Sequence, residues 1–218
     1  NNSNLLYSGS TKRIQLLACL DSIHPRVKAD KSLRNMIVKK LLDSDMFGNG
    51  RIAVGSMTLA LLDTFWDKLP TNPQESMLLI CAAAQTTVRM FVDQEVSTSF
   101  LYASSIKAFS MKELKSIQPV FLKLVEFHVF PVTPALICNE ILRLYGRTAS
   151  LEVFALSFIM QYNYHLYLSY SVLDMGVWLA NAMINKISHP VLEQLLKPPV
   201  DMPGYQLFSR ISTECLRV

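Results

Sequence analysis

The sequence predicts an all-helical protein. Long stretches rich in Leu, Ala, Met, Lys and Glu show no alternation of apolar and polar residues, and the 218 residues include only 7 glycines. Half of the residues are apolar and 17% are charged, which is typical of a globular protein and not of a disordered one. A chain of this length can bury a proper core, as one large domain or two small ones.

Proline, glycine and capping residues divide the first part of the chain into helical segments. Ser32 is the expected N-cap of the second segment, and the turn Gly48-Asn49-Gly50 is expected to end it. Ser110 and Glu113 have the spacing of a capping box, which starts the last segment of this part. The expected segments are 11–22, from 32 to the turn at 48–50, 52–69, 74–93, 98–108 and from 110 onward.

The fourth of these segments contains eight consecutive apolar residues, Met77–Ala84. A helix that is apolar on all sides is buried on all sides. We therefore expect this helix to lie at the centre of its bundle.

The second part of the chain repeats the order of helical segments found in the first part. Its expected helices are 133–145, 150–167, 170–187, 190–196 and 205–216. Ser76–Ala82 aligns with Ser171–Val177, and each of these stretches is preceded by two helical segments and followed by two. This order predicts two five-helix repeats. The expected division is an N-terminal extension with a helix over 1–30, a first bundle over 31–132 and a second repeat over 133–218.

Charge and cysteine usage narrow the classes of protein further. Six basic residues and one acidic residue lie within Arg26–Lys40. Such a strip is either a solvated helix face or a binding surface for nucleic acid or an acidic protein. The four cysteines form no C-x-x-C pair, which favours a reducing compartment. Residues 1–10 show no signal-peptide pattern, and polar residues recur through the apolar stretch 153–184, so we expect no membrane association.

Five positions in the first bundle carry a resemblance to a known family. They are separated by intervals of 29, 15, 11 and 29 residues. The sequence around the first resembles the family motif Met-Arg-Ala-Ile-Leu, and that around the second resembles Tyr-Ile-Asp-Arg-Phe. Phe127 and Thr133 resemble the closing stretch Phe-x-x-x-x-Pro-Thr, with Val132 in place of its proline. The five positions are Arg34, Asp63, Leu78, Arg89 and Gln118.

On these residues, the stretch 31–134 resembles the cyclin box, and 135–218 is similar only in pattern. The resemblance implies a cyclin fold of two five-helix repeats with an N-terminal helix, the second repeat being divergent. It implies a structural ion pair between Arg34 and Asp63, whose loss would cost about 3–5 kcal/mol. Val132–Leu136 and Glu140–Gly146 resemble the divergent cyclins of meiotic crossover formation.

The resemblance also implies which residues contact a partner kinase. Cyclins hold the kinase's regulatory helix with a Lys and a Glu, and this sequence has Arg89 and Gln118 at those positions. Leu122 and Phe127 complete the expected kinase-binding surface. Arg keeps the positive charge but adds a planar fork of donors, and Gln removes the negative charge, so this surface is chemically altered.

The peptide-docking groove of the family is eroded in this sequence. By resemblance the groove comprises Leu33, Met36 and Ile37, but Lys40 replaces the expected Trp and removes the largest apolar contact. Asp43 is placed to meet a basic residue. We therefore expect poor docking of short Arg-x-Leu-type peptides.

The sequence thus predicts a non-catalytic, cyclin-like regulatory subunit that binds a cyclin-dependent kinase and activates or targets it, in the nucleus or in both nucleus and cytoplasm. The alternative is a kinase-independent cyclin-fold adaptor in a nuclear protein or protein–DNA complex, which would contact nucleic acid through Arg26–Lys40. No metal-ligand spacing, phosphate-binding loop or nucleophile elbow occurs, so we expect neither an enzyme nor a cofactor.

Overall fold

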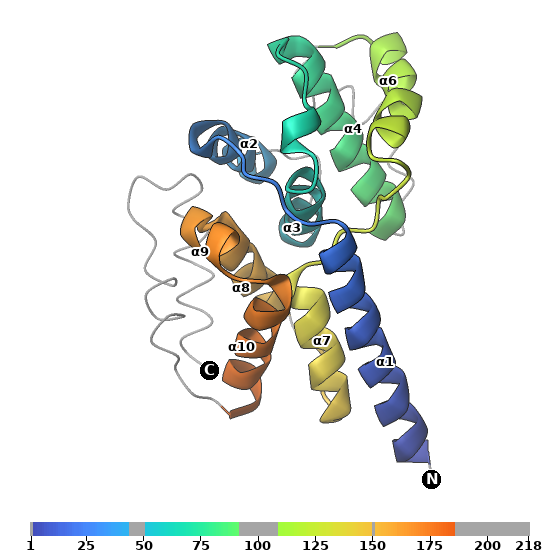
Figure 1. Cartoon of the computed structure of the whole chain (residues 1–218), viewed down its shortest axis with the longest axis vertical. Coiled ribbons are helices and arrows are strands. Elements are labelled where there is room, and N and C mark those ends of the chain that lie inside the picture. Colours follow the sequence, from blue (N-terminus) through green and yellow to red (C-terminus); the bar gives the residue numbers. More distant parts are fainter. Residues whose placement is uncertain (1, 44–50, 92–108, 150, 186–218) are drawn as a thin grey trace. The chain divides into compact units, whose positions relative to one another are not determined.

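A computed structural model of the chain describes residues 2–43, 51–91, 109–149 and 151–185 (Figure 1). Within these ranges the regular structure is helical and contains no strand, which confirms the all-helical prediction for this part of the chain. No helix in these ranges is long and apolar enough to span a membrane. The expected segments 98–108, 190–196 and 205–216 and the turn 48–50 lie outside the described residues.

The chain divides into two compact units. One is 26–131, and the other combines 1–25 with 132–218. In the first unit α3 packs on α2 and α4, and α4 packs on α6. Its described elements are α2 (Lys31–Asp43), α3 (Arg51–Leu62), the 3-10 helix η2 (Trp66–Lys68), α4 (Pro73–Phe91) and α6 (Met111–Leu124).

The second unit joins the N-terminal helix to the C-terminal half of the chain. Helix α10 packs most extensively on α7, and α1 packs along α7 (Figure 1). Its described helices are α1 (Asn2–Ile23), α7 (Pro134–Leu144), α8 (Leu151–Tyr162), α9 (Tyr164–Ser169) and α10 (Val172–Asn185).

Helix starts follow capping chemistry, with one correction to the sequence prediction. The capping box is confirmed: Ser110 Oγ accepts from the Glu113 amide, and the Ser110 amide donates to the Glu113 carboxylate. These bonds from Ser110 hold the pKa of Glu113 below its ordinary value. The N-cap of α2 is Asp30 and not Ser32, because Asp30 Oδ1 accepts from the Leu33 amide at 2.8 Å. The negative charge of Asp30 also interacts favourably with the positive, N-terminal end of the helix dipole.

Two expected helices are interrupted. The segment 52–69 ends as an α-helix at Leu62, where the amides of Thr64 and Phe65 turn to carbonyls three residues back and η2 follows. The segment 150–167 breaks at Asn163, whose side chain accepts from the Leu166 amide and starts α9. Both breaks arise from short polar side chains that compete for backbone hydrogen bonds.

Helix α4 is buried over a different stretch from the one expected. Met77, Leu78 and Cys81 are half-buried, so Met77–Ala84 is not buried on all sides. The buried part extends through the polar residues Gln85–Thr87. The Thr87 hydroxyl is satisfied there by the Ala84 carbonyl and by the Thr58 hydroxyl.

Each unit has its own apolar core. In the first, the rings of Phe65 and Phe121 meet edge to face with centroids 5.6 Å apart. In the second, Gly176 of α10 lies against Ile137 of α7 so closely that a Cβ there would enter the Ile137 side chain and stand 3.1 Å from the Pro134 carbonyl oxygen. Cys138 is buried beside this contact on α7, and burial raises the pKa of its thiol to about 12.

Candidate partner-binding surface

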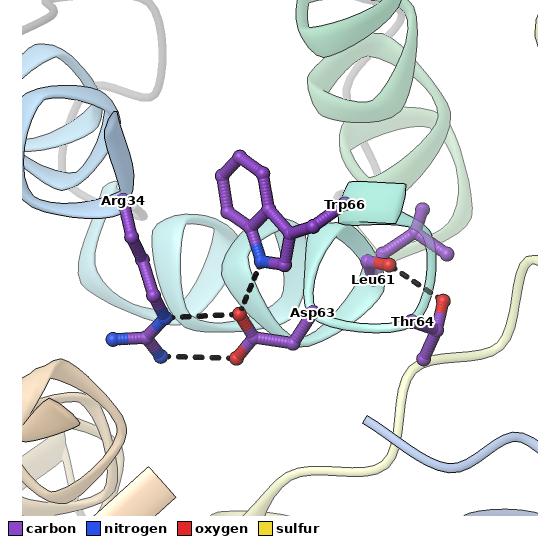
Figure 2. A network of polar contacts seen from close by, with 5 residues as sticks. All are labelled: Arg34, Leu61, Asp63, Thr64 and Trp66. Carbon is purple, nitrogen blue, oxygen red and sulfur yellow. Dashed lines mark hydrogen bonds and ion pairs between the residues drawn. The ribbon is translucent and has the colours of Figure 1, made fainter. Parts of the chain in front are cut away.

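A buried ion pair fixes α2 against the end of α3 (Figure 2). Arg34 is fully buried and donates through Nε and Nη2 to both carboxylate oxygens of Asp63, each at 3.0 Å. Trp66 Nε1 donates to the same carboxylate at 2.8 Å, and the Asp63 carbonyl accepts from the Val27 amide. Because a planar guanidinium held by two hydrogen bonds is fixed in orientation, this network positions the helices and is closed to solvent.

Gln118 occupies the contact between α6 and α4, where its side-chain amide is used internally. Its Nε2 donates to the Ala82 carbonyl at 3.2 Å and to Gln85 Oε1, and its Oε1 accepts from the Thr86 hydroxyl at 3.4 Å. Gln118 itself is half-buried, and Gln85 is only 3% exposed. The residue in the position of the family's glutamate thus joins two helices.

Arg89 lies one helical turn beyond Gln85 on α4, and its side chain is exposed. Among the described residues no acidic side chain forms an ion pair with it. Since residues four apart in a helix share a face, Arg89 stands on the same side of α4 as the Gln118 contact.

Leu122 and Phe127 continue this surface along α6 and its C-terminus. Leu122 is half-buried one turn after Gln118, and its carbonyl accepts from the Phe127 amide at 2.9 Å. Phe127 is 68% exposed and has a positive φ of 61°. Arg89 thus lies on α4, Gln118 and Leu122 lie on α6, and Phe127 lies just after the end of α6. Of the four, Gln118 bonds to the other helix, one turn before Arg89, and Arg89 and Phe127 are open to solvent.

The residues of the expected peptide groove differ in exposure. Leu33 is half-buried and Met36 is 44% exposed, whereas Ile37 is 1% exposed and lies in the core. Only Leu33 and Met36 of this apolar trio reach the surface. Lys40 and Asp43 lie on α2, but their side chains lie outside the described part of the structure.

The basic strip Arg26–Lys40 exposes less positive charge at the surface than its sequence indicates. Arg34 is withdrawn from it into the ion pair with Asp63. Lys28 and Lys31 are exposed, and Arg26 is half-buried. The side chains of Lys39 and Lys40 lie outside the described residues.

Three residues that shape this region escaped the sequence interpretation: Trp66, Gln85 and Thr86. A polar run, Gln85-Thr86-Thr87, directly after eight apolar residues was the available signal for the α4–α6 network. Buried polar groups require partners, so such a run inside a central helix indicates a hydrogen-bonded contact with a neighbouring helix. Trp66 gave no comparable signal.

Groups that carry other chemistry are not assembled in the described ranges. No group of three or more His, Cys, Asp and Glu side chains there is arranged to hold a metal ion. Of the described cysteines, Cys19 is exposed, Cys81 is half-buried and Cys138 is buried.

No protein-family model matches the sequence, and a search of the curated proteins finds no match either.

Proposed function

We propose that the chain is a cyclin-like regulatory subunit that binds a cyclin-dependent kinase and activates or targets it. The single observation that carries the proposal is the contact of α6 with α4, where Gln118 bonds to α4 one turn before the exposed Arg89, and Leu122 and Phe127 follow at the C-terminal end of α6. An exposed guanidinium without an acidic partner among the described residues and an exposed aromatic ring are both groups that protein interfaces bury. Activation would require a higher affinity for the active kinase conformation than for the inactive one.

The finer fold and the setting belong to the same proposal. The Arg34–Asp63 pair ties α2 to α3, as the cyclin box requires of its first two helices. Residues 76–82 lie on α4, which follows α2, α3 and the 3-10 helix η2, and residues 172–177 lie on α10, which follows α7, α8 and the short α9. These features support a cyclin fold with two five-helix repeats, and with it a nuclear, cell-cycle role of the meiotic crossover type.

A second candidate function is a kinase-independent cyclin-fold adaptor in a nuclear protein or protein–DNA complex. The observation that favours it is the internal use of Gln118, because a side chain bonded to Ala82 and Gln85 has little capacity left for a kinase. Activity decides between the candidates, since only the first raises the activity of a kinase on addition.

The proposal is tested by reversing the charge of Arg89. The purified chain is mixed with a panel of cyclin-dependent kinases, and complex formation on gel filtration and phosphorylation of a generic substrate are both measured. Arg89→Glu should abolish kinase co-purification, because a carboxylate would replace the cation that this surface presents to the partner. Lys12→Glu, at an exposed position on α1, changes the net charge equally and should leave the complex intact.

The outcomes separate the two candidates. A stable complex with raised kinase activity that Arg89→Glu destroys supports the regulatory subunit. A complex that survives Arg89→Glu excludes this surface as the kinase contact. Absence of any complex with the wild-type chain leaves the adaptor as the better explanation.

A further inference from the structure

The outer face of α6 carries a stripe of lysines that the proposed kinase surface does not use. Lys112, Lys115 and Lys123 are exposed, and they share one face with exposed Pro119, at spacings of three, four and four residues. None of the three lysines forms an ion pair with a described residue. The one acidic residue of α6, Glu113, is held in the capping box at Ser110.

This face is unfavourable for the helix that carries it. Lys112 places a positive charge in the first turn, where the helix dipole favours a negative one. Lys112 and Lys115 stand three residues apart, a spacing at which like charges repel. Pro119 has no amide hydrogen, so the carbonyl of Lys115 loses its usual donor inside α6.

Three locally unfavourable choices on one exposed face indicate that something other than helix stability accounts for it, because departures from local preference gather at functional sites. The stripe also borders the candidate partner-binding surface, since Lys115 lies three residues before Gln118 and Lys123 directly follows Leu122. Binding of a partner on α4 and α6 would bring the partner's neighbouring segment onto these lysines.

We propose that the stripe formed by Lys112, Lys115, Pro119 and Lys123 docks an acidic helical segment of the partner protein. From Lys112 to Lys123, eleven steps along the helix, the stripe extends about 16 Å along the helix axis. A partner helix with carboxylates three and eight residues apart would meet each ammonium in turn, with an apolar residue opposite Pro119. This inference deepens the proposed function and rests on it for the placement of the partner.

The observations favour a protein over a nucleic acid. Pro119 and the half-buried edge of Leu122 offer apolar contact between the charges, as a peptide helix requires. The stripe contains no aromatic side chain on which bases would stack.

The test uses a labelled synthetic helix with Glu at positions 1, 4 and 12, Leu at position 8, and Leu and Ala elsewhere, and follows its binding to the full chain by fluorescence anisotropy. The stripe variant carries Lys112→Glu, Lys115→Glu and Lys123→Glu. Its matched control carries Lys12→Glu, Gln15→Glu, Arg147→Glu and Thr148→Glu, all at exposed positions outside the strip Arg26–Lys40, so the two variants lower the net charge equally.

We expect the wild type and the control to bind the peptide with similar affinity and the stripe variant to bind at least about tenfold more weakly. Binding by the wild type should weaken as salt rises from about 50 to about 300 mM. A peptide with Gln in place of Glu should not bind. Circular dichroism should show the helicity of the wild type for the stripe variant, because Lys112→Glu places a negative charge in the first turn of α6, where the helix dipole favours it. If helicity is lost, a variant with Lys→Gln replacements at the same three positions is measured instead.

Equal binding by the stripe variant and the wild type overturns the inference, as does no binding by the wild type. Tighter binding of a single-stranded oligonucleotide than of the peptide, lost in the stripe variant, overturns it in favour of nucleic acid. The kinase assay is scored separately. If a kinase that co-purifies with the wild type is retained by the stripe variant, the inference is overturned and the proposed function stands. If the stripe variant loses peptide binding and no kinase binds the wild type, the inference that the stripe docks an acidic helix is supported and the proposed kinase role is wrong.

Discussion

Glu126 holds a backbone conformation that side chains rarely adopt, with φ at +52°. The reason is the end of α6: the Glu126 amide bonds to the Lys123 carbonyl and the Phe127 amide to the Leu122 carbonyl. This is the Schellman pattern, whose C′ residue must be left-handed. Helix α7 ends in the same pattern, with Gly146 at the equivalent position and φ at +68°. The described chain thus contains one such motif with glycine and one without.

Because Glu126 and Gly146 have the same left-handed backbone conformation, introducing glycine at 126 and removing it at 146 should change stability in opposite directions. Glu126→Gly should stabilise the protein by roughly 0.5–1 kcal/mol, because glycine adopts positive φ without strain. Gly146→Ala should destabilise it by about 1 kcal/mol through φ alone, since the space around an added Cβ is empty. The shift of the urea midpoint measures both changes.

Glu126→Ala is the control for the first substitution. It removes the weak ion pair of Glu126 with Lys68, 4.0 Å long and largely exposed, but keeps a Cβ at positive φ. Stability close to that of the wild type is expected for it. A midpoint for Glu126→Gly no higher than that of Glu126→Ala would contradict the strain argument.

Single residues were predictable from the sequence where the pattern itself encodes the contact. Arg34 and Asp63 were readable because the resemblance fixed their separation. Gly146 could be recognised as a glycine that ends a helix, whereas nothing in the sequence distinguishes Glu126 from any other exposed glutamate. Gln118 was singled out by the resemblance, but the bonds that its amide makes to Ala82 and Gln85 depend on how α4 and α6 approach each other.

At the scale of elements, helix starts were predictable and helix ends less so. The capping box at Ser110 is a local motif, so its geometry follows from the sequence. At α2 both Asp30 and Ser32 suit an N-cap, and in the structure Asp30 takes this role, because its Oδ1 accepts from the Leu33 amide. The break at Asn163 was missed because the apolar residues on both sides continue the helical pattern.

The contact between α7 and α10 depends on the missing side chain of Gly176. A methyl group there would overlap the Ile137 side chain and crowd the Pro134 carbonyl. Gly176→Ala should therefore destabilise the protein by about 1–3 kcal/mol, despite the better helix propensity of alanine. Thermal unfolding followed by circular dichroism measures the loss.

Gly9 in α1 is the matched control for Gly176. A Cβ at Gly9 meets only the end of the flexible Arg13 side chain, at 3.3 Å. Gly9→Ala should therefore be neutral or stabilising by up to about 1 kcal/mol. Equal loss of stability in the two variants would mean that the close packing at Gly176 is not the cause.

At the scale of the molecule, the sequence did not show that the first helix folds with the last ones. The expected division treated 1–30 as an extension, whereas 1–25 belongs to one compact unit with 132–218. More than a hundred residues separate α1 from α7, and no local pattern encodes a contact at that range. In the structure Leu17 is buried, and Arg13 Nε stands 3.8 Å from a buried oxygen of Glu140 on α7.

Two neighbouring leucines of α1 test whether this helix is part of the core of its unit. Leu17 is 9% exposed and Leu16 is 59% exposed. Leu17→Ala should cost about 2–3 kcal/mol, because it leaves a cavity in the packing of its unit, while Leu16→Ala should cost almost nothing. The two variants lose the same atoms and have the same helix propensity, so burial is the difference between them. Hydrogen exchange should show faster opening of α7 and α10 in Leu17→Ala alone. Unchanged exchange in those helices would return α1 to the role of a peripheral extension.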